Sequence, residues 1–122
     1  MRLALAIAVA GALGALARYG VDSFISKRAP GEFPWATFAI NVSGSFVLGL
    51  VLTVATARWP VWLRGGITVG FLGAYTTFST FAFQTYRLVE DRAVGLAAAN
   101  MLGSCVAGLA AVYLGVVVGR AV

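Results

Sequence analysis

A polar and aromatic segment, residues 70–81, lies inside an otherwise apolar stretch of the chain. It contains two glycines, four serine or threonine hydroxyls and four aromatic rings. If this stretch spans a membrane, each polar group without a partner costs roughly 2–7 kcal/mol. The segment is therefore expected either to pack against another chain or to line a path.

The chemistry that this segment favours is the binding of an anion. Phe78 and Phe81 are three residues apart, so they share a face of a helix. Thr77 and Thr80 do the same on a neighbouring face, with Ser79 between them. Phenyl rings have positive edges, so two ring edges beside hydroxyl donors can partly replace the water shell of an anion. The alternative for the two rings is ordinary core packing.

Polar residues elsewhere in the apolar runs are further candidates. Asn41 has an amide that can donate to an anion, or else hold two helices together. Asn100 and Ser104 are four apart on one helical face and form a second polar stripe. Arg18 is expected to be a fixed positive charge at a vestibule; alternatively it extends to the interface or pairs with Asp22, one turn later.

The glycines predict a break in the helix. Gly70 and Gly73, followed by the β-branched Thr76 and Thr77, lower helix propensity in the middle of the run. A break at membrane depth exposes backbone carbonyls, and such carbonyls commonly bind cations. Cys105 is the only cysteine and there is no histidine, which excludes an intrachain disulfide or a Cys/His zinc site.

The composition is that of an integral membrane protein. Of the 122 residues 61% are hydrophobic and 11% are charged, against about 25% charged in a soluble domain. A span needs about 20 apolar residues, so we expect four transmembrane helices in an all-α fold. They cover about residues 3–25, 35–57, 61–89 and 93–118 of one domain, 1–122. The alternative for the first run is a signal peptide.

The basic residues are shared equally between the two sides of such a bundle, apart from Arg18 near the end of the first span, which alone could tip the balance. One side has Arg2, Arg58, Arg64 and Arg120, and the other has Lys27, Arg28, Arg87 and Arg92. The positive-inside rule needs an asymmetry to fix a topology. The balance therefore favours a chain that inserts in both orientations and pairs as an antiparallel homodimer; the alternative is one weakly preferred orientation.

The chain closely resembles the small fluoride channels called Fluc or CrcB over essentially its whole length. Three segments carry the resemblance, residues 11–19, 41–49 and 70–81. The resemblance implies dual-topology homodimers with two fluoride pores and a broken third helix. It also implies a central sodium ion, structural and not transported, on the backbone carbonyls of Gly73 and Thr76. The pore residues implied by position are Asn41, Phe78, Phe81, Ser79 and Thr80, with Arg18 as the first-helix arginine.

The chain also departs from the family pattern. Tyr75 stands where a small residue is common, and Gln84 stands where a glutamate is frequent. A tyrosine early in the fourth helix is missing, and Asn100 and Ser104 supply the polar groups there instead. These differences concern the outer polar track more than the central site.

The resemblance therefore implies a passive channel that exports cytoplasmic fluoride and lowers its toxicity. Its expected place is the inner or plasma membrane, with fluoride, lipids and a second copy as partners and no nucleic acid. No enzyme is expected, because no nucleophile–base or acid/base set is present. The main alternative is a four-helix proton-coupled multidrug exporter, which needs a carboxylate in the first span, where only Asp22 is near. A non-transporting assembly subunit is a second alternative.

Overall fold

A computed structural model describes residues 1–55 and 59–122, and these residues form helices joined by short connections. The elements are α1 (Arg2–Arg28), α2 (Trp35–Val54), α3 (Val61–Gly65), η1 (Gly66–Leu72), α4 (Gly73–Tyr75), α5 (Phe78–Glu90) and α6 (Val94–Ala121). Residues 56–57 of the expected second span, and the counted residue Arg58, lie outside the described residues.

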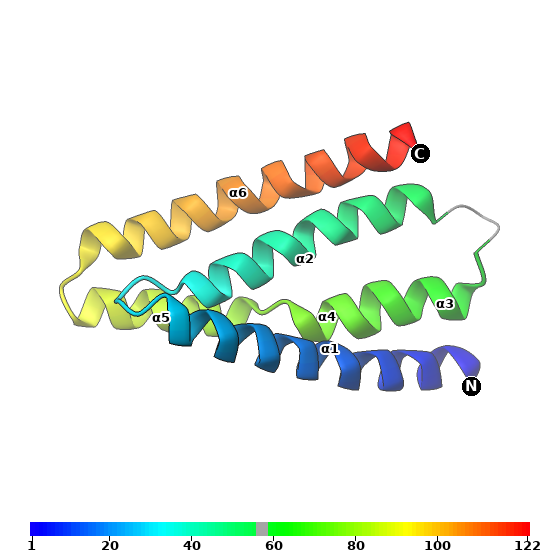
Figure 1. Cartoon of the computed structure of the whole chain (residues 1–122), viewed down its shortest axis with the longest axis horizontal. Coiled ribbons are helices and arrows are strands. Elements are labelled where there is room, and N and C mark those ends of the chain that lie inside the picture. The colour runs from blue at the N-terminus through cyan, green and yellow to red at the C-terminus, as the bar shows by residue number, and fades with distance from the viewer. Residues whose placement is uncertain (56–58) are drawn as a thin grey trace.

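Three of the described helices are long and apolar enough to cross a membrane. They are α1 with 27 residues, α2 with 20 and α6 with 28. At 1.5 Å per residue, 20 helical residues cover the hydrocarbon thickness of about 30 Å. Residues 61–90, which we call the composite segment, contain four shorter elements, α3, η1, α4 and α5, which follow one another along one line (Figure 1).

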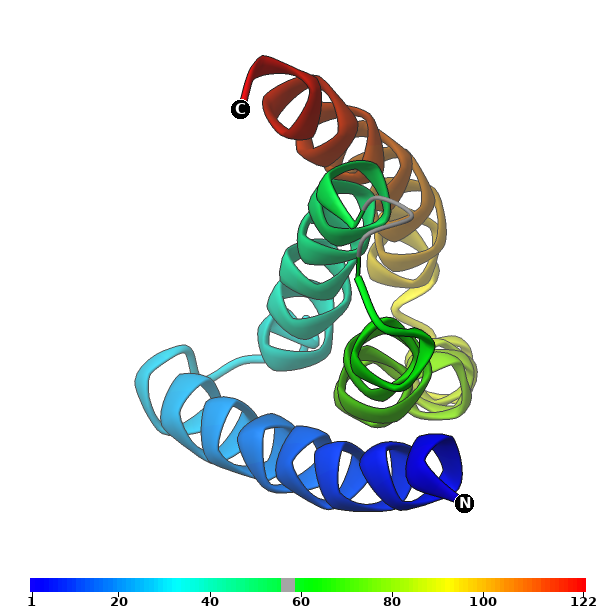
Figure 2. The same ribbon diagram turned by 90° about the vertical axis from the view of Figure 1, so that its right-hand side faces the viewer.

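The elements run back and forth between two ends of the molecule. Both termini lie at the end where α2 leads to α3, and the other two connections lie at the opposite end (Figure 1). The most extensive packing joins α2 to α6, and α1 packs along η1 and α4. Seen end-on, α1 and α6 lie on opposite sides, with α2 and the composite segment between them (Figure 2).

Close helix approach depends on glycine at several contacts, of which two are the tightest for α6 and α1. A Cβ at Gly115 of α6 would collide with the carbonyl oxygen of Phe46 in α2. A Cβ at Gly14 of α1 would collide with the carbonyl oxygen of Phe71 in η1. Backbones that approach this closely maximise van der Waals contact, the main attraction between helices in lipid. These two glycines therefore set how α6 and α1 dock on the rest of the subunit.

Few side chains of the single subunit are fully covered. Ile40 and Asn100 are the largest described side chains that are less than 2% exposed. Long apolar residues on the outside of α1 and α6 are exposed, as expected of helices that face lipid. Exposed polar groups away from the helix ends therefore need a specific explanation.

Candidate functional site

The composite segment is interrupted at Thr76 and Thr77. The helix α4 ends at Tyr75, and α5 begins at Phe78. Between them Thr76 has φ −81° and ψ 159°, and Thr77 has φ −150° and ψ 119°, both extended conformations. The preceding turns, η1, have π-helical hydrogen bonding, which is rare and often found at functional sites.

The side-chain amide of Asn41 in α2 stabilises the extended backbone at Thr77. Its Nδ2 donates to the carbonyl oxygen of Thr77 at 3.0 Å, and the Thr77 N–H donates to Oδ1 at 2.8 Å. The amide thus replaces two helical partners that Thr77 lacks. The second N–H of the Asn41 amide has no partner in these two bonds. The prediction that Asn41 donates to an anion therefore depends on this one hydrogen.

Two backbone carbonyls lose their usual helical donors at this point. In an unbroken α-helix the Thr77 N–H would bond the Gly73 carbonyl, and the Thr80 N–H would bond the Thr76 carbonyl. Instead the Thr77 N–H bonds Asn41, and the Thr80 N–H bonds the Thr77 hydroxyl at 3.2 Å. The Gly73 and Thr76 oxygens are therefore suited to bind a cation, which is how the sequence resemblance assigned them.

The interruption borders an open groove of about 330 Å³ between α2 and the composite segment. The groove brings Asn41 together with Gly73, Thr76, Thr77 and Phe78. Five of the residues that the sequence singled out thus lie around one hollow. Its depth depends on close approach of α2, which has glycine at position 44 opposite the methyl group of Thr76.

The hydroxyl groups form a short hydrogen-bonded chain. The Thr77 hydroxyl caps α5 by accepting from the Thr80 N–H, and it donates to the Thr80 hydroxyl at 3.0 Å. The Ser79 hydroxyl lies 3.5 Å from the Thr77 oxygen. Thr80 accepts in this chain, so its own hydrogen is free to donate, and both Ser79 and Thr80 are exposed.

The two phenylalanines lie together beside these hydroxyls. The ring centroids of Phe78 and Phe81 are 5.7 Å apart, and the rings are tilted by 46°. Phe81 is partly covered, whereas Phe78 is 78% exposed on the single subunit. The rings therefore belong to an uncovered face rather than to the core of the subunit, which answers the core-packing alternative for Phe78.

Arg18 lines a second chamber of about 370 Å³ between α1, α2 and α5, which shares Thr77 with the groove. Asp22, Thr37, Thr80 and Gln84 also line it, so Arg18 shares a space with one end of the hydroxyl chain. Within the described residues no ion pair joins Arg18 to Asp22. Thr37 carried no sequence signal, because a single threonine near a helix start is common.

Comparison with known proteins identifies the family. The family model described as CrcB-like protein, Camphor Resistance, matches residues 5–116. The chain belongs to the CrcB family. Its relatives include proteins named Fluoride-specific ion channel FluC. The protein of Acidobacterium capsulatum is 49% identical over 117 residues, which are 93% of each chain. That of Citrifermentans bemidjiense is 46% identical over 117 residues, 94% of each, and that of Geotalea uraniireducens is 42% identical over 123 residues, 99% of each.

The sequence-based resemblance to the CrcB family is thus confirmed. The family is one of ion channels rather than of enzymes, as the names of the relatives state. Together with three helices able to cross a bilayer, membership makes the chain a multi-pass protein of the inner membrane. The residue roles inferred from the CrcB resemblance stay predictions.

Two of the departures from the CrcB pattern, Tyr75 and Gln84, have defined places. The hydroxyl of Tyr75 lies 3.0 Å from that of Ser43 in α2, and its ring stacks on Phe71 at 5.9 Å. The tyrosine therefore fastens the last turn before the interruption to its two neighbours. Gln84 places its Oε1 in a buried position without a protein hydrogen-bond partner, next to the Arg18 chamber.

The second polar stripe fastens α6 to α5. The Asn100 Nδ2 donates to the Thr85 hydroxyl at 2.8 Å, and Thr85 donates to the Phe81 carbonyl at 2.8 Å. Ser104 donates to Asn100 Oδ1 at 3.3 Å. Sequence reasoning missed Thr85, because a lone threonine in a helix ordinarily bonds its own backbone. Asn100 is 1% exposed, so its contribution to a pore stays a prediction.

Proposed function

We propose that this chain is a fluoride-selective channel that passively exports cytoplasmic fluoride and lowers its toxicity. The observation that carries the proposal is the interrupted segment, where freed carbonyls border an open groove and hydroxyl donors and a pair of phenyl rings follow directly along the chain. Membership of the CrcB family and relatives named as fluoride-specific channels support the choice of ion.

The active form is an antiparallel, dual-topology homodimer. Gly73, Ser79 and Thr80 are exposed on a single subunit, and such groups are unfavourable against acyl chains. A second copy packed against these exposed groups would cover them. The equal count of basic residues on the two sides permits that copy to insert in the opposite orientation. Twofold symmetry then repeats every path, which gives two pores per dimer.

A structural sodium ion is part of this proposal. The Gly73 and Thr76 carbonyls have lost their helical donors, so two subunits facing each other would bring like-oriented oxygen dipoles together. A bound cation would offset their repulsion. The ion supplies a fixed positive charge at the contact and is not transported.

Fluoride passes along the ring and hydroxyl face. Fluoride is small and strongly hydrated, so a selective path must be narrow and must offer donors in place of water. The Ser79 and Thr80 hydroxyls, with the remaining Asn41 N–H, supply donors, and Phe78 and Phe81 set the width and present ring edges. Arg18 attracts anions to the vestibule, and Asn100 and Ser104 form the secondary polar track.

Flux from liposomes tests the function directly. Purified protein reconstituted into liposomes loaded with potassium fluoride is expected to release fluoride when valinomycin dissipates the voltage, as read by a fluoride electrode. Liposomes loaded with potassium chloride are the matched control and should release no more chloride than protein-free liposomes. Equal release of the two halides, or release of neither, would refute a fluoride-selective channel.

A further inference from the structure

An apolar groove runs along the outer face where α1 meets α3 and η1. Two hollows of about 220 and 320 Å³ share Ala6, Val9 and Trp62 and so form one groove, which we call the α1–α3 groove. Val9 is 56% exposed and Trp62 is 44% exposed, so the groove opens outward on the described subunit. Arg2 lines the larger of the two hollows, at the N-terminal end of α1.

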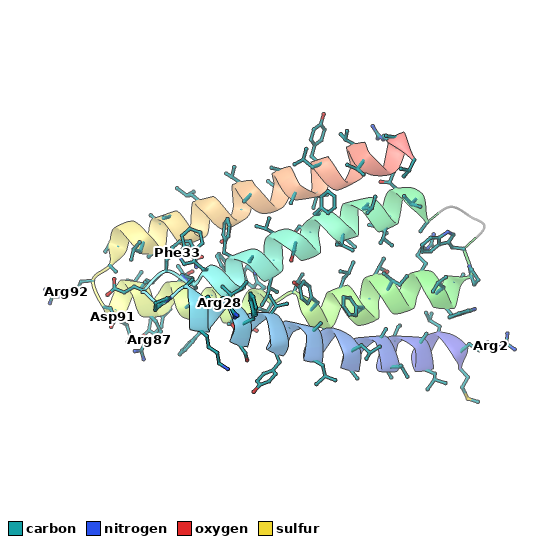
Figure 3. The ribbon with its side chains drawn as sticks, viewed as in Figure 1. Arg2, Arg28, Phe33, Arg87, Asp91 and Arg92 are labelled. Carbon is teal, nitrogen blue, oxygen red and sulfur yellow. The ribbon has the colours of Figure 1, made fainter. Side chains whose placement is uncertain are left out.

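The end of the molecule that carries Arg2 has basic residues and no acidic ones. The four acidic residues all lie in the last turns or connections at the opposite end, and they are Asp22, Glu32, Glu90 and Asp91. Figure 3 shows Arg2 at one end and Arg87, Asp91 and Arg92 at the other. The two ends therefore have equal numbers of basic residues but unequal net charge. Acidic residues contribute little to membrane topology, but they do contribute to the surface potential at their end.

We propose that the α1–α3 groove binds one anionic phospholipid, with an acyl chain along Val9 and Trp62 and the phosphate beside Arg2. The apolar lining fits a hydrocarbon chain, and a tryptophan near a helix end fits the boundary between acyl chains and headgroups. The charge fits as well, because Arg2 has no acidic neighbour at its end to compete with a phosphate. The inference requires insertion in a membrane and does not depend on fluoride conduction.

Trp62 gives a direct signal for occupancy. A single-tryptophan protein, Trp35→Phe with Trp59→Phe, would be reconstituted with phospholipids whose acyl chains are brominated and quench indole fluorescence. Brominated phosphatidylglycerol is expected to bind about fivefold more tightly than brominated phosphatidylcholine, the ratio that one arginine near an anionic headgroup supplies.

Paired variants separate the site from general attraction at the membrane surface. Arg2→Gln with Lys27→Gln removes one basic residue from each side, so topology stays balanced, and it should abolish the preference for phosphatidylglycerol. Arg120→Gln with Lys27→Gln keeps the same balance and should retain the preference, because α6 ends on the opposite side of the bundle (Figure 2).

A second pair tests the apolar part of the groove. Val9→Phe fills the groove and should weaken quenching by both lipids, whereas Leu16→Phe, at an exposed position outside the groove two turns further along α1, should not. Equal quenching by both lipids, or a preference that survives the loss of Arg2, would overturn the proposal. Absence of quenching by either lipid would show that the groove is closed to acyl chains, and would overturn the proposal too.

Discussion

Replacement of Asn41 with leucine is expected to reduce fluoride flux by more than tenfold and to lower the thermal stability of the protein. Leucine has nearly the same size but cannot bond the backbone N–H and carbonyl of Thr77, which Asn41 bonds at 2.8 and 3.0 Å. A buried polar group left without a partner costs about 1–3 kcal/mol, and two groups would be affected. Thr76 and Thr77 would then either return to a helical conformation or lose their fixed backbone geometry. Both outcomes change the groove between α2 and the composite segment.

The matched control for Asn41 is Thr53→Val on the same helix. Thr53 donates to the Gly49 carbonyl of its own helix at 2.8 Å and valine keeps its shape, so the replacement should change flux and melting temperature little. Liposome flux and thermal unfolding in detergent would be measured for both variants. If Asn41→Leu keeps the flux and melting temperature of the unaltered protein, the amide does not hold the interruption.

Phe78→Ile and Phe81→Ile are each expected to lower fluoride flux by about tenfold or more, with the dimer intact. Isoleucine keeps an apolar side chain but has no polarised ring edge to face an anion, and about 1.4 kcal/mol of lost stabilisation gives a factor of ten. Phe78 is 78% exposed on the subunit, so its replacement should hardly affect subunit stability. The loss of flux would then report on the path itself.

Phe24→Ile on α1 is the control for the two rings. Phe24 is an exposed phenylalanine outside the groove between α2 and the composite segment. Size-exclusion chromatography would establish that each variant keeps its oligomeric state before flux is compared. Unchanged flux in both Phe78→Ile and Phe81→Ile would remove the rings from the mechanism.

Much of the fold follows from local sequence. Long apolar runs bounded by charged turns predicted helices at positions that α1, α2 and α6 occupy, since length and hydropathy are local properties. The glycines marked residues 70–77 as weakly helical. Which two residues become extended was not predictable, because Asn41 of another helix captures the backbone of Thr77.

The site was predictable by composition and less so by contact. The resemblance named Gly73 and Thr76 by position, and the reason that their carbonyls are free is a set of hydrogen bonds between distant segments. Likewise Asn100 was recognised as polar, but its partner Thr85 lies 15 residues away on another helix. Spacing identifies which side chains share a helical face, whereas tertiary packing decides what each one bonds.

The measurement that tests the central claim most directly is complementation between chains of opposite fixed orientation. Lys27→Gln with Arg28→Gln leaves two basic residues on one side against four, and Arg2→Gln with Arg120→Gln produces the reverse bias. We predict that liposomes containing either double variant alone release fluoride at the protein-free rate, and that co-expressed variants purified together restore release. Full fluoride release from one double variant alone would contradict a channel built from two oppositely inserted copies.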